Sequence, residues 1–230
     1  MPKPNPITYF DTEGSDNLAH VIKILKKTLE RRTELRTSKL IFLTAEGRGP
    51  AMAYSALEAF DPKIIAVTFA PGACAKKDGK PYIPKIPERA RKFFEGVEIP
   101  ILSSRLPLDA LGSWTSYADS KSKVIVDTLS LFGGSVHLAI QAVLQACDMG
   151  YVEIGELVFA ITGDCILLVL ASSTALFLTP NQGLVIEEIL CKPRRFTLTR
   201  RAAASTPPLT IEGNNDSTGE DSQRSKLLIE

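Results

Sequence analysis

The chain has 230 residues, of which 44% are hydrophobic and 23% are charged, and its formal net charge is +1. This composition is typical of a soluble globular protein and excludes whole-chain disorder, collagen and a coiled coil. Because a near-neutral chain has no strong field that would attract nucleic acid, we expect no nucleic-acid partner.

The first long predicted element is a helix, which follows a short apolar stretch at residues 7–10. Residues 15–17 (Ser-Asp-Asn) supply side chains that commonly cap a helix N-terminus. From Leu18 to about Arg36, apolar residues recur mostly at steps of three and four, which indicates one face of an amphipathic helix. The opposite face is basic, and we interpret it as a solvated surface, with an RNA- or anion-binding strip as the alternative.

Two apolar runs, residues 39–44 (KLIFLT) and 63–68 (KIIAVT), predict buried strands. Between them a turn leads into a helix that extends to about Ala59, and Pro50 is suited to its first turn. This order of strand, helix and strand is that of a βαβ unit, whose crossover should be right-handed.

The next segment alternates loops with short elements. Residues 70–86 are rich in proline and glycine and predict a loop, after which residues 87–96 predict a short helix. A strand over residues 98–102 is weakened by Pro100, and a second long loop follows over residues 103–121.

The C-terminal half predicts two helices and then two or three strands. The helices cover residues 123–132 and 135–149, on either side of a Gly-Gly pair. Two apolar runs, residues 157–162 and 166–171, predict buried strands, and residues 185–190 fit an edge strand or a short helix.

The apolar run over residues 157–178 is also long enough to span a bilayer. Asp164 splits this run, and a carboxylate at the centre of a membrane is costly. We therefore expect two buried strands and no membrane partner. The first six residues hold three prolines and no apolar run, so they do not predict a signal peptide.

The four cysteines and two histidines are widely spaced, without a CxxC pair. A zinc site needs clustered ligands, so we predict no metal site. We interpret the cysteines as reduced and partly buried, which favours a reducing compartment and a cytoplasmic location.

The charge is unevenly distributed along the chain. Residues 202–230 hold five acidic and two basic residues, with few aromatics and many Ser, Thr and Asn. We predict one domain over residues 1–201 and a disordered acidic tail over residues 202–230. The alternation of strands and helices predicts that the domain is α/β, with a largely parallel sheet and helices on both of its faces.

Ligands of such sheets bind outside the carboxyl ends of the strands, which here are the loops after Thr44, Thr68, Leu102 and Thr162. The first of these loops is the sharpest signal, because it leaves a buried strand and enters a helix. Helix N-termini attract anions, glycines let a ligand approach the backbone, and an arginine can hold a phosphate or carboxylate with two hydrogen bonds. The candidate residues in this loop are Thr44, Glu46, Gly47, Arg48 and Gly49.

Two observations limit the ligand interpretation of this loop, and one alternative stays open. Glu46 lowers the local positive potential, which disfavours a highly charged ligand, and the sequence is neither a Walker A loop nor a GxGxxG fingerprint. The loop is also consistent with a tight connecting turn that leaves Arg48 in solvent.

The ends of two other strands add candidates for the same crevice. Thr68 ends the second strand and Gly72 lies in the turn after it, while Thr162 and Gly163 end the fourth strand in the same way. Asp164 is a candidate base or ribose-hydroxyl acceptor, with a turn aspartate as the alternative. His137 and Gln141 share one helix face, and we interpret the histidine as structural.

Several stretches resemble the stand-alone pyruvate kinase C-terminal domain-like proteins, in the same order along residues 7–196. Residues 39–68 (KLIFLTAEGRGPAMAYSALEAFDPKIIAVT) resemble the strand–TxxGR–helix–strand segment of the pyruvate kinase C-terminal domain. The other similar stretches are ITYFDTEGSDN, the helix from LFGG to ACDMG, GELVFAITG and IEEILCKPR.

The resemblance implies a three-layer α/β/α domain, whose mostly parallel sheet has about five strands including one antiparallel edge strand. It also implies a chain without pyruvate kinase activity, since the catalytic barrel would need about 250 further residues. Some relatives bind flavin mononucleotide (FMN) at the same strand ends. By resemblance, FMN is therefore a candidate cofactor, and the residues that would contact it are Thr44, Gly47, Arg48, Thr68, Gly72 and Gly163. The turn after Thr162 is shorter here than in those relatives, which removes backbone N–H donors.

The sequence thus supports three functional hypotheses. The first is a domain that binds a small phosphorylated ligand, FMN being one candidate. The second is an enzyme acting on a small phosphorylated or carboxylated substrate, with Glu46 or Asp164 as general base. The third is a regulatory or interaction module without catalysis. Related domains often oligomerise, so a homo-oligomer is expected.

Overall fold

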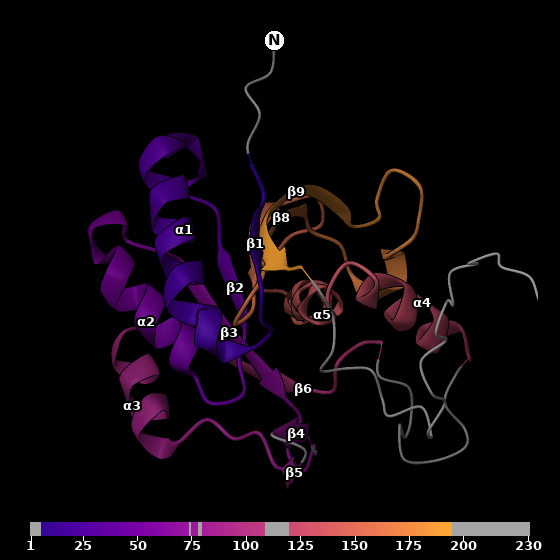
Figure 1. Cartoon of the computed structure of the whole chain (residues 1–230), viewed down its shortest axis with the longest axis horizontal. Coiled ribbons are helices and arrows are strands. Elements are labelled where there is room, and N and C mark those ends of the chain that lie inside the picture. The colour runs from indigo at the N-terminus through magenta and orange to yellow at the C-terminus, as the bar shows by residue number, and fades with distance from the viewer. Residues whose placement is uncertain (1–5, 74, 78–79, 109–119, 195–230) are drawn as a thin grey trace, which may run out of the picture. The chain divides into compact units, whose positions relative to one another are not determined.

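A computed structural model of the chain describes residues 6–73, 75–77, 80–108 and 120–194. These residues form an α/β fold around a seven-stranded mixed sheet, most of whose strands are parallel (Figure 1). The order of strands across the sheet is β1-β9-β8-β7-β2-β3-β6. The strands are β1 (Thr8–Phe10), β2 (Leu40–Leu43), β3 (Ile64–Phe69), β6 (Ile101–Ser104), β7 (Leu157–Ile161), β8 (Ile166–Leu170) and β9 (Val185–Pro193).

The helices fall close to the positions that the sequence predicts. They are α1 (Leu18–Arg31), α2 (Arg48–Leu57), α3 (Glu88–Gly96), α4 (Ser120–Ser130) and α5 (Gly134–Asp148). Helix α1 ends earlier than expected, since Thr33–Leu35 forms a separate 3₁₀ turn that buries Leu35. The segment predicted as a loop over residues 70–86 contains a small antiparallel pair of strands, β4 (Ala75–Lys77) and β5 (Lys80–Tyr82).

The sheet differs from the expected one in strand number and in the place of the antiparallel strand. It has seven strands rather than about five. Strand β8 is antiparallel to both β7 and β9, and it lies inside the sheet rather than at its edge. The reason is that β9 continues the sheet beyond β8 and β1 then pairs with β9 in parallel, so the prediction of an edge strand at residues 185–190 is wrong.

Buried side chains form one apolar cluster on each face of the sheet. Leu40 and Phe42 of β2 belong to the cluster that contains residues of α1, α2 and α3, whereas Ile41 and Leu43 belong to the cluster that contains α5. This alternation is the period of a strand that is buried on both faces. Figure 1 shows α1, α2 and α3 on one side of the sheet and α5 and α4 on the other.

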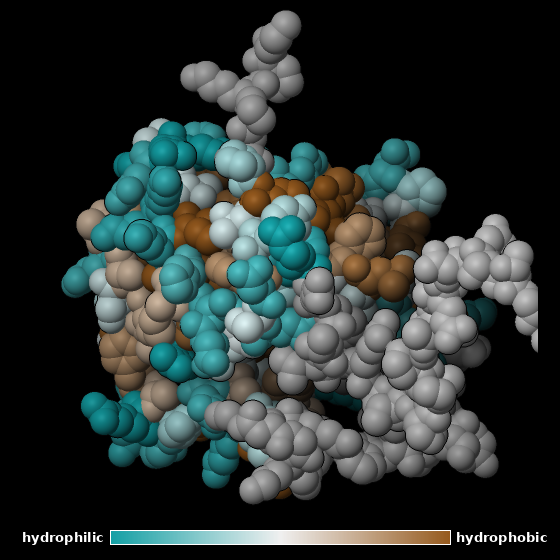
Figure 2. Space-filling model, in the orientation of Figure 1, coloured by the Kyte–Doolittle hydropathy of each residue, from teal (hydrophilic) through white to brown (hydrophobic). Residues whose placement is uncertain are grey.

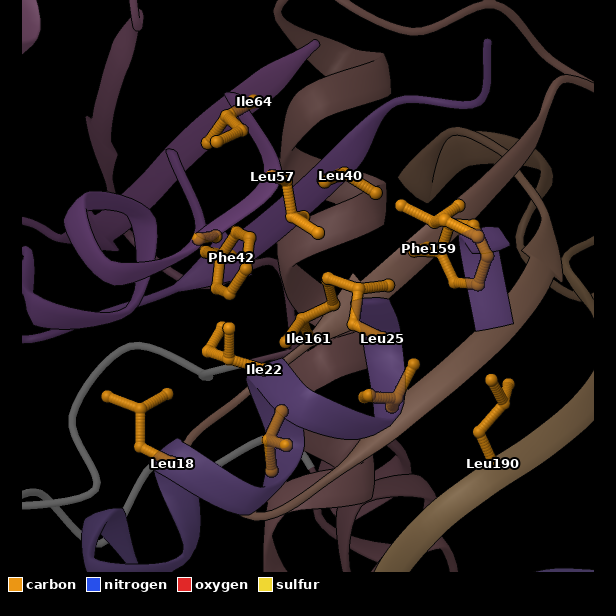
Figure 3. Close-up of a cluster of buried hydrophobic side chains, with 14 of the residues drawn as sticks. Leu18, Ile22, Leu25, Leu40, Phe42, Leu57, Ile64, Phe159, Ile161 and Leu190 are labelled. Atoms are coloured by element: carbon orange, nitrogen blue, oxygen red, sulfur yellow. The ribbon is translucent and has the colours of Figure 1, made fainter. Parts of the chain in front are cut away.

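Figure 3 shows the first of these clusters, with side chains of α1 directed at the sheet. Leu18, Ile22 and Leu25 of α1 occupy one helical face and are buried. They pack with Phe42 of β2 and Ile161 of β7, which are also buried. The predicted amphipathic helix therefore buries its apolar face on the sheet.

By its internal contacts the chain divides into Met1–Arg200 and Arg201–Glu230. The predicted acidic tail over residues 202–230 lies outside the described residues and stays a prediction. The run over residues 157–178 forms β7, β8 and a 3₁₀ turn, as the buried-strand interpretation predicts. Among the helices that the structure describes, none has the length and apolar character needed to cross a membrane.

Candidate functional site at the carboxyl edge of the sheet

The predicted site residues lie at or after the carboxyl ends of β2, β3 and β7. Strand β2 is parallel to both β3 and β7, and β3 is parallel to β6, so all four strands end at one edge of the sheet. This edge is where ligands of open α/β sheets bind. Its residues divide into a group around the start of α2 and a group around the β7–β8 turn.

The loop after β2 is held by a hydrogen bond within itself. The backbone N–H of Gly47 donates to Oγ1 of Thr44 at 2.9 Å, which closes a tight turn before α2. Gly47 has a φ of +83°, and a Cβ on it would lie 3.0 Å from the ring of Phe94 and 3.3 Å from Ile86. The turn therefore needs glycine both for its backbone angle and for the packing of α3 against the loop.

The second glycine of this loop also has a packing role. Gly49 is buried, and a Cβ there would lie 3.1 Å from the ring of Phe42 on β2. Its missing side chain lets the first turn of α2 approach the strand closely. The prediction that these glycines admit a ligand is not tested by this packing.

Arg48 and Glu46 are the exposed charges of the loop. Arg48 is the first residue of α2 and forms no hydrogen bond or ion pair with any residue that the structure describes. The pKa of Tyr82, at the end of β5, is raised mainly by burial and secondly by the charge of Glu46. The guanidinium of Arg48 thus stands in solvent at the positive end of a helix.

Thr68 places a buried hydroxyl beside this loop. Val67 packs on the α5 face, so the alternation of β3 turns Thr68 to the face shared with α2 and α3. Thr44 continues the pairing of the two strands, since its N–H donates to the carbonyl of Val67 at 2.9 Å. Thr68 is 3% exposed, and within the described part of the chain its Oγ1 has no hydrogen-bond partner.

Ser103 is a neighbour of Thr68 that the sequence reasoning missed. The two residues are in register across β3 and β6. The hydroxyl of Ser103 donates to the carbonyl of Phe69 at 2.9 Å, so it does not satisfy Thr68. The signal available in the sequence was its position directly after Leu102, the strand end that was already singled out.

Gly72 lies apart from these residues. It is exposed in the turn after β3, has a φ of +81°, and a Cβ on it would meet no atom within 4 Å. Its role in the described structure is therefore conformational, since no neighbour approaches its backbone closely.

The second group is engaged with the N-terminal part of the chain. The hydroxyl of Thr162 donates to Oδ1 of Asp164 at 3.2 Å, and the N–H of Gly14 donates to Oδ2 at 2.6 Å. Gly163 lies under the same segment, because a Cβ on it would stand 3.0 Å from the Cα of Ser15. The loop after β1 therefore covers the β7–β8 turn.

Asp164 joins the β7–β8 turn to the loop after β1 through its hydrogen bonds. It is 4% exposed, and burial raises the pKa of its carboxyl, while hydrogen bonds from Gly14 and Thr162 oppose this shift. Both carboxylate oxygens accept hydrogen bonds from the protein itself. The arrangement does not favour Asp164 as a general base, because a base needs a free oxygen within reach of a substrate proton.

His137 and Gln141 face two different partners. The Nδ1 atom of His137 lies 3.3 Å from the hydroxyl of Ser130, and burial lowers the pKa of the imidazole to about 4. Gln141 accepts a hydrogen bond from the N–H of Leu108 at 2.8 Å. Both side chains are buried and tie α5 to its surroundings, which agrees with the interpretation of a structural histidine.

The described residues contain no group of three or more His, Cys, Asp or Glu side chains that could hold a metal ion. In comparisons with known proteins, no family model and no curated protein matches this chain. The assignment to the pyruvate kinase C-terminal domain-like family therefore stays a proposal.

Proposed function

We propose that the chain binds a small phosphorylated ligand at the carboxyl ends of β2 and β3, beside the start of α2. The observation that carries this proposal is the hydroxyl of Thr68, which is buried without a hydrogen-bond partner among the residues that the structure describes. A buried polar group left unpaired costs about 1–3 kcal/mol of stability. Such a cost is common at binding sites, where the ligand supplies the missing partner.

The surroundings of Thr68 favour an anionic ligand. By helix geometry, the first N–H groups of α2 have no partner within the helix, and its N-terminus carries a partial positive charge. The exposed guanidinium of Arg48 adds a full positive charge at the same helix end. Glu46 beside it reduces that charge, which favours a ligand with one phosphate over a polyphosphate.

FMN is the ligand with a single phosphate that the family resemblance favours. We also propose that the domain has the three-layer α/β/α arrangement of the pyruvate kinase C-terminal domain and that it lacks pyruvate kinase activity. The glycines of the loop after β2 are part of the proposal as well, because their close packing holds the start of α2 against β2 and α3.

Calorimetric titration with FMN, a sugar monophosphate (fructose 6-phosphate) and inorganic phosphate tests the proposal. We expect FMN or the sugar phosphate to bind with a dissociation constant below 1 mM, and Arg48→Ala to weaken it by 1.5–3 kcal/mol, or about 10- to 150-fold. Thr68→Val should weaken it by 0.5–1.5 kcal/mol, or about 2- to 10-fold, because the change removes only the hydroxyl.

Arg31→Ala is the matched control. Arg31 is exposed and is the last residue of α1. The first residue of that helix follows the loop after β1, so Arg31 lies at the opposite helix end from that loop. Its removal should leave binding unchanged. The proposal is rejected if none of the three compounds binds more tightly than millimolar, or if Arg31→Ala weakens binding as much as Arg48→Ala.

A further inference from the structure

The helices on the two sides of the sheet differ in charge. Among the helices that the structure describes, α1, α2 and α3 together contain eight basic and three acidic residues, a net charge of +5, whereas α4 and α5 together have a net charge of zero. The basic residues of the first group are all exposed: Lys23, Lys26, Lys27, Arg31, Arg48, Arg89, Arg91 and Lys92. We call the outer surface of α1, α2 and α3 the basic face. The net charge of +1 for the whole chain, on which the expectation of no nucleic-acid partner rests, conceals this asymmetry.

The basic face is one continuous surface. Helix α1 contacts α2, and the ring of Tyr54 on α2 lies edge-on to the ring of Phe93 on α3, with their centroids 5.7 Å apart. Figure 1 shows the three helices on the same side of the sheet, and Figure 2 shows hydrophilic residues over α1. Because packed helices lie about 8–10 Å apart, the face is roughly 20 Å wide. A single extended polyanion can therefore contact all three helices.

The cations of α1 form a regular row. Lys23, Lys27 and Arg31 are four residues apart, which places successive charges along one side of the helix at intervals of about 6 Å. Lys26 adds a fourth charge beside this row. None of the four forms an ion pair with another described residue, so their charges are available to a partner. Evenly spaced cations suit the evenly spaced phosphates of a nucleic-acid backbone.

Phe93 supplies an exposed aromatic ring within the basic face. It is 38% exposed, and its ring contacts the rings of Tyr54 and Phe94, which support it from within the protein. Arg89 lies one turn before Phe93 on the same side of α3, and Lys92 immediately precedes Phe93 in the chain. An aromatic ring beside cations is the arrangement on which the unpaired bases of single strands stack.

We propose that the basic face binds a single-stranded nucleic acid, with its phosphates on the cations of α1 and α3 and one base on Phe93. A membrane surface is a poorer match, because interfacial helices insert apolar side chains and no large apolar side chain of α1 or α2, both fully described, is exposed. A protein partner is also a poorer match, because lysine is depleted at protein–protein interfaces. This inference does not depend on the proposed ligand.

Fluorescence anisotropy of the full chain with a labelled single-stranded RNA of about 20 nucleotides tests the proposal. Near physiological salt we expect a dissociation constant of about 1–100 μM, with a slope of log K against log salt of about −3 or steeper, because α1 alone offers four phosphate contacts. A variant that combines Lys23→Gln, Lys27→Gln and Arg31→Gln should weaken binding at least about tenfold and reduce the steepness of the slope by about 2.

The matched control combines Arg105→Gln, Lys121→Gln and Lys123→Gln. It removes the same total charge from exposed residues outside the basic face, since Arg105 follows β6 and both lysines belong to α4. Contacts with phosphates, unlike the overall charge, depend on position, so this variant should change the affinity less than about twofold and keep the wild-type salt slope.

Phe93→Leu tests the contact with a base. Leucine keeps an apolar side chain at this position but removes the ring, so the variant should bind the RNA at least about 5-fold more weakly. Its affinity for heparin, a polyanion without bases, should stay unchanged, which also shows that the fold is intact.

Four outcomes would overturn the proposal. The first is that the RNA does not bind more tightly than millimolar, and the second is that the control weakens binding as much as the α1 variant. The third is that Phe93→Leu leaves RNA binding unchanged or weakens RNA and heparin equally. The fourth is that vesicles of phosphatidylserine and phosphatidylcholine bind more tightly than the RNA, which would assign the basic face to a membrane surface.

Discussion

Gly163 lies directly under Ser15, so that a Cβ on Gly163 would stand 3.0 Å from the Cα of Ser15 and 3.4 Å from its backbone nitrogen. The two residues belong to the β7–β8 turn and to the loop after β1. The contact is between backbones, which cannot move aside as a flexible side chain can. Glycine is needed here for space, whereas its backbone angles are open to other residues.

Replacing Gly163 with alanine should therefore destabilise the fold. The added methyl group must displace the loop after β1, and overpacking of this kind costs about 1–3 kcal/mol. Urea denaturation followed by circular dichroism measures the effect. Gly96→Ala is the control, because a Cβ on Gly96 meets no atom within 4 Å, and this variant should be neutral or slightly more stable. Equal stability of the two variants would contradict the packing of the loop against Gly163.

Replacing Thr68 with valine should stabilise the protein while it weakens ligand binding. Valine keeps the branched shape that suits β3 and removes the buried hydroxyl that has no partner. The expected gain is about 1–3 kcal/mol in the free energy of unfolding without ligand. Urea denaturation of the ligand-free protein checks it, and a loss of stability would show that the hydroxyl is satisfied in solution.

His137 should make the protein less stable as the pH falls. Burial lowers the pKa of its imidazole from 6.5 to about 4, so between these values the unfolded chain binds a proton that the folded chain does not. The contribution of His137 to the free energy of unfolding is present in full above pH 6.5. It is lost as the pH falls toward 4, and the total loss is about 3 kcal/mol.

The variant His137→Gln isolates this contribution. Measured across pH 4 to 7, its free energy of unfolding should fall less steeply than that of the wild type, because the residue no longer titrates. His20→Gln is the control, since His20 is exposed, and it should keep the wild-type slope. Parallel slopes for wild type and His137→Gln would contradict a buried neutral imidazole.

The buried cysteines should resist alkylation in the folded protein. Burial raises the pKa of the Cys191 thiol to about 12 and holds that of Cys165 well above its ordinary range, and both side chains are 0% exposed. Because the thiolate is the reactive form, iodoacetamide at pH 8 should modify neither residue before unfolding. Peptide mass spectrometry with and without urea distinguishes the two states, and labelling of native Cys165 would show that the core opens.

The central βαβ unit was predictable because its signals are long and local. The apolar runs over residues 39–44 and 63–68 match β2 and β3 to within a residue or so at each end. In contrast, β1 and the β4–β5 pair have three residues per strand, which is too short for a two-residue period to be recognised. The interior position of β8 depends on how far β9 and β1 extend the sheet, which no local pattern encodes.

The candidate site was predictable in its loops but not in its contacts. The topology brings the ends of β2, β3 and β7 to one edge, as expected for parallel strands. The pairing of Asp164 with Gly14 joins residues 150 positions apart, so nothing near Asp164 indicates its partner. Likewise, the Thr68 hydroxyl lacks a hydrogen bond from its register neighbour because the Ser103 hydroxyl donates to the carbonyl of Phe69. No local sequence pattern encodes that geometry.

The pairing of β1 with β9 bears on how the protein is made. Thr8 lies beside Cys191 in the sheet, so an emerging polypeptide must hold its first strand unpaired until nearly all of the described residues have been synthesised. Until then β8 also lacks its neighbour β9. The sheet is therefore completed by a contact between the two ends of the described chain, and contacts between such distant segments form slowly.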